Sequence, residues 1–464
     1  MGLKTKGLRL NAQASRLKIK DSSNMINPSI FKAYDVRGIY PAELDEESAY
    51  QVGRAFVKYS GAKRVAVGYD ARLSGPVLFK ALCEGIVCQG ADIYDIGQVP
   101  TEGLYFAVGS YDFDAGIMIT ASHNPKEYNG FKMMTKKGDD IIWVRGVDLL
   151  PTSEENIFQE KSSGTIFKKD IWQDYIEHMI KFKGSIKPFK IVVDASNGVI
   201  GNAILKLKNV LPVEIIELNF APDGNFPAHS PNPLEKDASN QIQEAIKQNG
   251  ADFGFMFDGD ADRIFLVDEN GQLINGDITL LLLAKYFLQK NPGMGIAYNA
   301  ICSRAVPKFV KQWGGVPIRT QVGFVNVREG LIKNNGIMGG EVSCHYCFKD
   351  YFYMDSGIIA FLTLLNILSE DERKVSQILK EISPYVKAEM NFQTSDKEEI
   401  LERIKENYAN GAQDFLDGVT IEYQDWWFNV RPSNTEPLLR LTIEADNQEL
   451  LDEKREELSR FLNN

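Results

Sequence analysis

Three parts of the sequence repeat the same two-part pattern, and this repetition constrains the fold more than any other feature. The first part is a short β-type run followed by Asp or Asn and then Ala, at RVAVGYDAR (64–72), KIVVDASNG (190–198) and GIAYNAICSR (295–304). The second part is Gly-apolar-Met followed by a polar loop, at GIMITASHN (116–124), GFMFDGDAD (254–262) and GIMGGEVSCH (336–345). Hydrophobic strands can resemble one another by chance, but two matches in the same order, three times over, favour three related domains.

Helix-like stretches lie between these strands, such as SGPVLFKALCEGIVCQG (74–90) and SNQIQEAIKQNG (239–250). Strands that alternate with helices predict α/β units with mixed, largely parallel sheets. Because ligands of such sheets bind at the carboxyl ends of the strands, we expect the three polar loops to converge on one cleft.

The repeat stops near residue 384, and a charged helical stretch, two strands and a final helix follow. They predict a smaller α+β domain at the C-terminus, and a chain of 464 residues is long enough for three or four domains. Residues 1–24 are basic and polar without an apolar core, so they are not a secretory signal; we expect a disordered tail, with Met25 as a candidate natural start. The expected domains are 25–168, 169–270, 271–384 and 385–464.

The composition excludes several classes of protein. A net charge of −11 argues against a broad nucleic-acid surface, and no apolar run reaches membrane-spanning length. The five cysteines are odd in number and scattered, which favours a reducing cytoplasm over a disulfide framework. We expect a cytoplasmic monomer or weak homo-oligomer that binds neither nucleic acid nor membrane.

DGDADR places Asp258, Asp260 and Asp262 at alternate positions, so on extended backbone the three carboxylates share one side. Three close like charges favour a cation with oxygen ligands, and Mg²⁺ is the first candidate, with Mn²⁺ or Ca²⁺ as alternatives. An EF-hand loop is disfavoured because its sixth position is Arg263 rather than glycine. A solvated acidic turn without a metal is the plainer alternative. Arg263 is a candidate phosphate ligand.

Ser122 and His123 follow a predicted core strand and suggest a hydrolase pair. Neighbouring side chains on extended backbone point to opposite faces, so we expect His123 to be poorly placed to deprotonate the serine. The flanking residues do not form the G-x-S-x-G elbow of a hydrolase either. A serine without an adjacent base fits a phosphate carrier that completes the coordination of a metal held by the aspartates.

Two further loops carry polar groups. GGEVSCHY places Glu341, Ser343 and His345 at alternate positions, where a carboxylate and a hydroxyl suit the vicinal hydroxyls of a sugar. A zinc site at Cys344 and Cys347 is disfavoured because too few ligands converge there. For both His345 and His123, an ordinary histidine packed in the protein interior is the alternative. RPSNTEP supplies donors suited to a phosphate, although a turn held by Asn and Ser side chains is equally consistent; the donors are Arg431, Ser433, Asn434 and Thr435.

With these motifs in this order, TASHNP, DGDADR, GEVS-H and RPSNTEP, the chain resembles the α-D-phosphohexomutase family, in its phosphomannomutase/phosphoglucomutase group. The resemblance runs from about Ile30 to the C-terminus. It implies three related α/β domains and a smaller fourth around one cleft. It also implies a phosphorylated Ser122 and Mg²⁺ on the three aspartates.

The resemblance further implies roles for residues that alone are weak signals. Arg37, Lys132, Arg263 and His345 match positions near the transferred phosphate, with Lys132 or His345 in proton transfer. Glu341 and Ser343 match the sugar loop, and the RPSNTEP residues match the loop for the other phosphate. We add His123 to the expected catalytic residues and Tyr34, from FKAYDVRG, to the substrate-binding ones.

The implied reaction interconverts a hexose 1-phosphate and a hexose 6-phosphate, of mannose, glucose or both, through a 1,6-bisphosphate that is also the expected activator. Three residues depart from the family pattern: Cys344 replaces a common glycine or alanine, Phe324 a common histidine and Ile301 an occasional lysine. The last two leave the sugar open, so a phosphoglucosamine mutase remains an alternative. A metal-dependent sugar phosphatase and a non-catalytic binding protein are the others.

Overall fold

The computed structural model describes residues 26–153, 163–394, 396–433 and 438–463. The chain forms two compact units, the first made of Met1–Leu273 with Met354–Ser369 and the second of Ile274–Tyr353 with Glu370–Asn464. The expected N-terminal tail, 1–24, lies outside the described residues, and the expected domain boundaries remain predictions.

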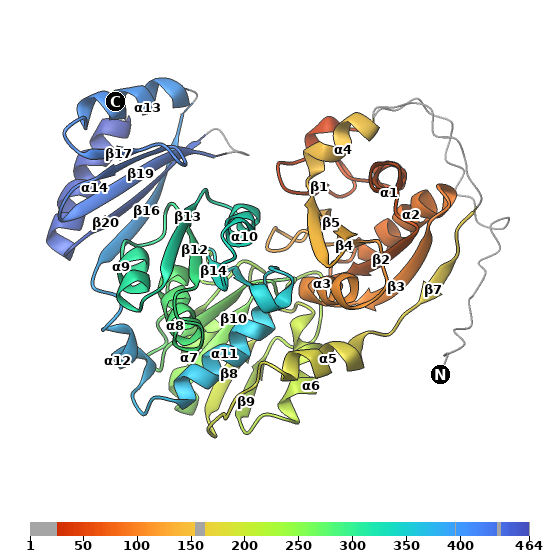
Figure 1. Ribbon diagram of the computed structural model, residues 1–464, viewed down its shortest axis with the longest axis horizontal. Helices are drawn as coiled ribbons and strands as arrows, with labels where there is room; N and C mark the ends of the chain where they lie inside the picture. Colours follow the sequence, from red (N-terminus) through yellow and green to blue (C-terminus); the bar gives the residue numbers. More distant parts are fainter. Residues whose placement is uncertain (1–25, 154–162, 395, 434–437, 464) are drawn as a thin grey trace. The chain divides into compact units, whose positions relative to one another are not determined.

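Six strands of the first sheet of unit 1 follow the order β1-β5-β4-β2-β3-β7 (Figure 1). A seventh strand, β6, pairs with β5. Strands β2, β3, β4 and β7 run parallel, and β5 runs antiparallel to β4. Strands β2 and β4, in the middle of the sheet, read as apolar runs because helices cover both of their faces. The strands are β1 (Val36–Ile39), β2 (Arg64–Tyr69), β3 (Asp92–Gln98), β4 (Ala115–Ile119), β5 (Tyr128–Lys137), β6 (Asp140–Val144) and β7 (Ile166–Lys168).

Two successive residues of β4, whose side-chain positions lie on opposite faces, show which helices cover each face of this sheet. Ile117 belongs to the core formed with α1 and α2, whereas Gly116 faces α3, where a Cβ would meet the side chains of Leu104 and Val108. The helices of this region are η1 (Pro28–Ile30), α1 (Glu46–Ser60), α2 (Gly75–Cys88), α3 (Thr101–Ser110), α4 (Gly146–Ser153) and α5 (Trp172–Ile180).

The second sheet of unit 1 has the order β11-β10-β8-β9. Its strands are β8 (Lys190–Asp194), β9 (Glu214–Leu218), β10 (Phe253–Phe257) and β11 (Ile264–Val267), and its helices are α6 (Ile200–Lys208), α7 (Asn240–Asn249) and α11 (Gly357–Ser369). Helix α11 falls in the sequence range expected for the third domain, yet it packs on this second sheet. Phe361 of α11 contacts the rings of Phe255 and Phe257, and the Asn366 side chain accepts a hydrogen bond from the amide of Gly184.

The third sheet lies in unit 2, in the order β13-β12-β14-β15. Strands β4, β10 and β14 each lie beside a parallel strand and precede an antiparallel one, so the three sheets share one arrangement. The predicted relation between three α/β domains is confirmed. The elements are β12 (Gly295–Asn299), β13 (Val316–Thr320), β14 (Met338–Gly340), β15 (Tyr346–Phe348), α8 (Gly276–Lys290), α9 (Ala305–Gln312), α10 (Phe324–Lys333), η2 (Lys349–Tyr351) and α12 (Val375–Leu379).

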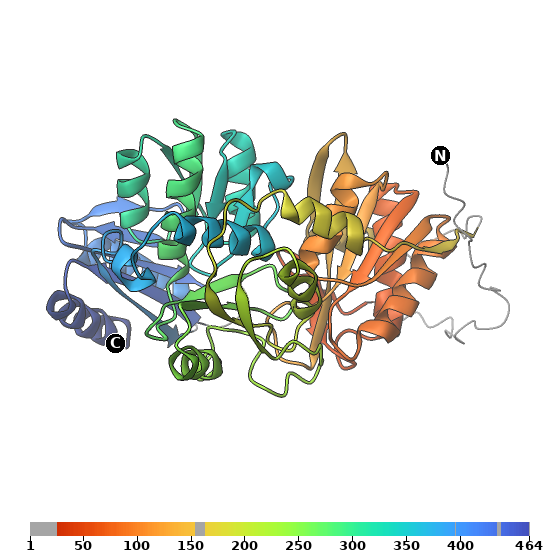
Figure 2. The same cartoon turned by 90° about the horizontal axis from the view of Figure 1, so that it is seen from below.

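The fourth sheet is entirely antiparallel, in the order β16-β20-β19-β18-β17. Helices α13 and α14 share one apolar core with it, and α14 runs beside the sheet in Figures 1 and 2. This confirms the predicted α+β domain at the C-terminus. None of the described helices combines the length and the apolar character that crossing a membrane requires. The elements are β16 (Val386–Gln393), β17 (Ala412–Asp414), β18 (Val419–Glu422), β19 (Trp426–Pro432), β20 (Leu438–Ala445), α13 (Lys397–Asn407) and α14 (Gln448–Asn463).

Candidate active site

Ser122 lies in the loop that follows the fully buried strand β4, and it is itself only 4% exposed. Its φ of 50° lies in the left-handed region, which non-glycine residues rarely adopt. The amide of Ser122 donates to Thr120 Oγ1 at 2.8 Å, and its hydroxyl donates to Asp258 Oδ2 at 3.0 Å. The serine is therefore fixed, with its oxygen against the acidic loop, which is the turn of DGDADR at residues 258–262.

The extended backbone assumed at Ser122, which would place the side chains of Ser122 and His123 on opposite faces, is wrong. Because Ser122 has a left-handed rather than an extended backbone, His123 Nδ1 lies 3.4 Å from Ser122 Oγ. This separation exceeds the usual range for a hydrogen bond, and the contact of the hydroxyl with Asp258 is shorter at 3.0 Å. The hydroxyl is thus paired first with a carboxylate.

The three aspartates of DGDADR converge, although by a different route from the one expected. Residues 258–262 form a turn in which Ala261 has a φ of 65°, not an extended strand. Asp258, Asp260 and Asp262 are buried, and one oxygen of each lies within 4.8 Å of the others. Asp260 Oδ1 is buried and has no hydrogen-bond partner among the described residues. A donor set made only of oxygen, with one oxygen left unpaired, fits a hard divalent cation such as Mg²⁺.

Two buried cations contact the carboxylates. Lys132 Nζ from β5 lies 2.7 Å from Asp260 Oδ2 and also bonds Asp262, and Arg263 Nε lies 2.9 Å from Asp258 Oδ2. Burial opposes ionisation of Asp260, but the attraction of Lys132 prevails and holds its pKa well below the usual range. Burial and the neighbouring carboxylates raise the pKa of Asp258 to about 6 against the pull of Arg263. Burial opposes the charge of Lys132, but the attraction of Asp260 and Asp262 prevails and raises its pKa.

Arg263 and Arg37 supply further positive charge near Ser122. Arg263 is 3% exposed, and its Nη2 has no hydrogen-bond partner among the described residues. Arg37, on β1, donates from Nη1 to Asn124 Oδ1 at 2.7 Å and pairs with Asp35. Tyr34 is half-buried, and its carbonyl accepts a hydrogen bond from Trp143 Nε1 at 2.6 Å. A buried guanidinium nitrogen without an acceptor is a ready phosphate ligand.

Within GGEVSCHY of unit 2, residues 341–344 form a turn between β14 and β15 rather than extended backbone. Glu341 is 3% exposed and accepts hydrogen bonds from Ser343 Oγ at 3.0 Å, from the amide of Gly323 at 2.7 Å and from Asn299 Nδ2 at 2.9 Å. Cys344 has a φ of 67°, a left-handed conformation that favours glycine. Three donors, one from the turn, one at the end of β12 and one just before α10, fix the carboxylate.

The ring of His345 stacks on Phe324, with centroids 5.4 Å apart and planes at 25°. Phe324 therefore supports the ring of His345, the histidine expected to move a proton.

The phosphate-type loop begins at the end of β19. Arg431 lies directly opposite Arg440 of β20 in the strand register, a residue that the sequence reasoning missed. Burial lowers the pKa of Arg431, and the Arg440 charge adds to this effect against Asp417. Like charges on paired positions favour an anion between them. The carbonyl of Ser433 accepts from Lys397 Nζ at 3.0 Å, while Asn434 and Thr435 lie outside the described residues.

The start of α3 holds residues that no motif singled out. Thr101 donates its amide to the Asp260 carbonyl at 3.0 Å and its hydroxyl to the Asp260 carboxylate. The neighbouring Glu102 is fully buried and accepts hydrogen bonds from the Ser356 hydroxyl and, at 3.2 Å, from the Ile358 amide at the start of α11. One dipeptide thus joins the acidic loop to α11.

The buried position of Glu102 predicts a pH-dependent stability. Burial raises its pKa from 4.5 to about 8, although the bonds from Ser356 and Ile358 favour the charged form. The folded protein keeps this proton where the unfolded chain releases it, so the contribution of Glu102 to stability is lost as pH rises from about 4.5 to about 8. Between these pH values, the free energy of unfolding of wild type should fall by on the order of 1–4 kcal/mol more than that of Glu102→Gln. Thermal melts of both proteins at pH 5.5 and 8.5 measure this, and parallel pH dependence would contradict it.

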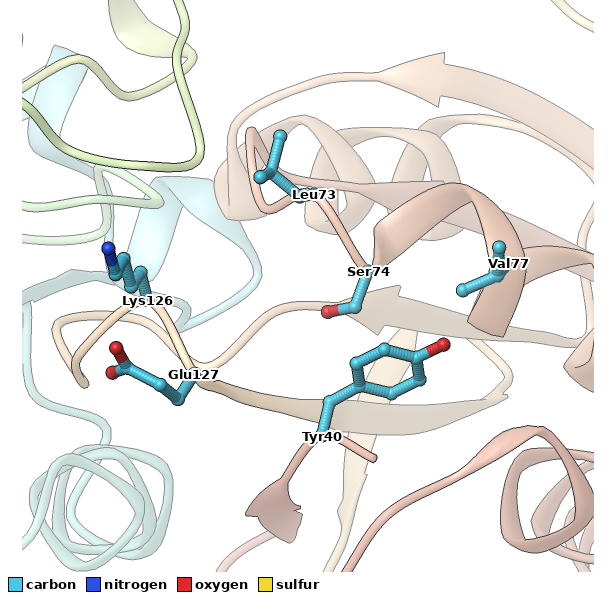
Figure 3. Close-up of a pocket in the computed structure, with 6 residues that line it drawn as sticks. All are labelled: Tyr40, Leu73, Ser74, Val77, Lys126 and Glu127. Carbon is cyan, nitrogen blue, oxygen red and sulfur yellow. The ribbon is translucent and has the colours of Figure 1, made fainter. Parts of the chain in front are cut away.

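A separate surface pocket lies beside the Ser122 loop and is lined by Tyr40, Leu73, Ser74, Val77, Lys126 and Glu127 (Figure 3). It encloses about 230 Å³, less than the roughly 300–1,000 Å³ typical of small-molecule sites. None of the expected site residues lines this pocket, and we assign it no ligand.

Comparison with known proteins identifies the family. The domain models of phosphoglucomutase/phosphomannomutase match the chain in order: α/β/α domain I at residues 28–142, domain II at 173–271, domain III at 275–385 and the C-terminal domain at 389–460. The chain belongs to the phosphoglucomutase/phosphomannomutase family. The predicted membership and the predicted class of enzyme, a mutase that transfers phosphate, are therefore confirmed.

Individual relatives agree with the family assignment. A phosphomannomutase of Methanocaldococcus jannaschii is 36% identical, over 93% of this chain and 97% of its own length. A phosphomannomutase of Vibrio cholerae is 37% identical, over 93% of this chain and 98% of its own length. The crystal structure of a phosphoglucomutase/phosphomannomutase family protein from Burkholderia thailandensis superposes with a TM-score of 0.87, at 34% identity, over 94% of this chain and 98% of that one.

Proposed function

We propose that this enzyme interconverts the 1-phosphate and 6-phosphate of mannose and of glucose through phosphorylated Ser122 and a hexose 1,6-bisphosphate. The observation that carries the proposal is the position of Ser122 Oγ, 3.0 Å from Asp258 Oδ2. Arg263 Nε contacts the same carboxylate oxygen, and Arg263 Nη2 has no hydrogen-bond partner among the described residues. A serine oxygen at a carboxylate and a spare guanidinium donor suits a carrier of phosphate.

In the first half-reaction, a sugar hydroxyl attacks the phosphorus of phosphoserine 122, and the bond from phosphorus to Ser122 Oγ breaks. Lys132 contacts Asp260 in the loop that Ser122 Oγ faces, and its proposed role is to give a proton to the departing Oγ. His345 is proposed to accept the proton of the sugar hydroxyl, and His123 to orient the loop next to Ser122. Arg37 and Arg263 are proposed to bind the oxygens of the moving phosphate. Mg²⁺ on Asp258, Asp260 and Asp262 supplies positive charge to those oxygens when bound.

In the second half-reaction, the bisphosphate is proposed to reorient and to return its other phosphate to Ser122. The phosphate that is not transferred is proposed to bind at Arg431, Ser433, Asn434 and Thr435, with Arg440 opposite Arg431 as an additional ligand. Tyr34 is proposed to contact the substrate beside Arg37. The expected compartment is the cytoplasm, because all five cysteines, each in the described part of the chain, are free thiols.

The sugar preference follows from the loop that holds Glu341 and Ser343. This loop is proposed to read the 3- and 4-hydroxyls, which glucose and mannose present identically. Ile301 and Phe324 offer no polar side-chain group that would distinguish carbon 2, and Ile301 is buried. Strong discrimination needs a buried polar group that the wrong substrate leaves unpaired.

We therefore expect the kcat/KM values for glucose 1-phosphate and mannose 1-phosphate to differ by less than about 100-fold, the range of a weak contact. Glucosamine 6-phosphate, with its charged amine, should be poorer than both. Steady-state kinetics on the three sugars measures this. A preference for glucosamine phosphate would favour a phosphoglucosamine mutase, and a difference of thousands between the two hexoses would refute the dual specificity.

The remaining alternative is a metal-dependent phosphatase, which would pass the phosphate to water. Release of inorganic phosphate, measured beside the isomerised product, separates the two activities. The proposal requires many isomerisations for each phosphate released.

A further inference from the structure

Arg72 is a buried arginine that the reaction described above does not use. It follows strand β2, is 1% exposed, and belongs to none of the motifs that indicated the function. An isolated buried guanidinium is costly, so its partners are informative. All of its η nitrogens face one loop.

That loop is the one that carries Ser122. Arg72 Nη2 donates to the carbonyl of Ser122 at 2.8 Å and to that of Asn124 at 2.6 Å, while Nη1 donates to those of Pro125 at 2.6 Å and Tyr128 at 2.9 Å. Four carbonyls that the turn directs inward are thus satisfied by one side chain. A planar fork of five N–H donors can do this, whereas the three donors of a lysine cannot.

The charge of Arg72 is balanced within the same network. Asp70 pairs with Arg72 Nε at 3.2 Å and accepts the Arg72 amide at 2.9 Å. Thr120 Oγ1 donates to Asp70 at 2.7 Å and accepts the amide of Ser122. Both backbone polar groups of Ser122 are therefore held by the same cluster.

The second sheet's loops cover this cluster. The ring of Phe226 lies 5.3 Å from Arg72 Cζ, and Gly224 lies so close that a Cβ there would stand 2.8 Å from Arg72 Cα. Phe226 also borders Gly259 of the acidic loop, next to the carbonyl of Ser122. The guanidinium is enclosed between the serine loop and the loops of the second sheet.

We propose that Arg72 is a positioning residue for phosphoryl transfer: its guanidinium holds the left-handed Ser122 loop in one conformation, so that Ser122 Oγ stays at the acidic loop. This rests on the proposed role of Ser122 as the carrier. A serine in a disfavoured backbone conformation returns to other conformations when its supports are removed. Substrate binding needs none of the carbonyls that Arg72 holds, so the effect falls on the transfer step.

The test compares Arg72→Lys and Phe226→Leu with wild type and with Arg304→Lys. Arg304 is a suitable control because it also bonds backbone carbonyls, those of Gln424 and Asp425, but in unit 2. Arg72→Lys should lower kcat about 10- to 100-fold, the equivalent of one or two lost hydrogen bonds to a charged group, with KM within about threefold. Phosphate released to water per isomerisation should rise. Phe226→Leu should move both readouts in the same direction by less.

The control should leave kcat and phosphate release unchanged. Wild-type kcat in a folded Arg72→Lys protein, or an equal loss of kcat in the control, would overturn the proposal. If Arg72→Lys does not fold, an unchanged kcat and phosphate release in Phe226→Leu would overturn it. Mass mapping of the phosphate on wild type keeps the two proposals apart: phosphate elsewhere than Ser122 contradicts the carrier, whereas phosphate on Ser122 with an indifferent Arg72 contradicts only the positioning role.

Discussion

Ser122→Ala is expected to abolish isomerisation of every hexose phosphate, lowering kcat at least about 1,000-fold, or roughly 4 kcal/mol in the activation barrier. The reason is that no other oxygen takes its place. Ser122 Oγ is the atom that lies 3.0 Å from Asp258, beside the guanidinium of Arg263. Alanine and serine both carry a Cβ, so the strain of the left-handed φ of 50° is unchanged and the fold should persist.

Two measurements check this expectation. Intact mass after incubation with glucose 1,6-bisphosphate should show one added phosphoryl group in wild type and none in Ser122→Ala. Ser110→Ala, at the exposed end of α3, is the matched control and should keep both activity and phosphorylation. Full activity in Ser122→Ala, with phosphate mapped to another residue, would disprove the carrier.

Removal of divalent metal is expected to stop turnover, and Asp260→Asn should have the same effect in the presence of Mg²⁺. Asp260 is fully buried, one of its oxygens has no hydrogen-bond partner among the described residues, and the other faces Lys132. Loss of one carboxylate charge from an oxygen-only site should weaken Mg²⁺ binding at least about 100-fold, or roughly 2.7 kcal/mol.

A binding readout makes this test independent of activity. Titration calorimetry should detect Mg²⁺ binding to wild type, and saturating Mg²⁺ should raise its Tm because ligand binding stabilises the folded state. Both effects should disappear in Asp260→Asn and persist in Glu244→Gln, a control on the exposed side of α7. Undiminished turnover in metal-free protein would refute a required metal.

The prediction of the fold succeeded where the information was local. Gly-apolar-Met runs and helical stretches such as residues 74–90 follow the periods of strands and helices, and the structure has β4, β10, β14 and α2 at those places. The threefold order of these patterns predicted three related α/β domains because sequential βα units have few ways to pair. The position of helix α11 differed from the expected one, in the third domain. An apolar helix packs on whichever sheet leaves an apolar face open, and for α11 that is the second sheet.

The chemistry of the site was also readable from residue types. Three aspartates in five residues, a serine at a strand end and arginines in polar loops indicate a metal and a phosphate wherever the chain places them. The sequence determined which groups are present and that strand ends present them. It also directed the assignment to a phosphohexomutase, which the family comparison supports.

The tertiary structure decided how these groups face one another. The alternation argument assumed extended backbone, whereas Ser122 and Ala261 adopt positive φ and turn their loops, which brings His123 toward Ser122 and gathers the aspartates. Arg72 and Glu102 gain their meaning from partners 50 or more residues away. A residue's own neighbours in sequence carry no record of such contacts, because burial, charge pairing and a strained φ are set by the packing of distant segments around it.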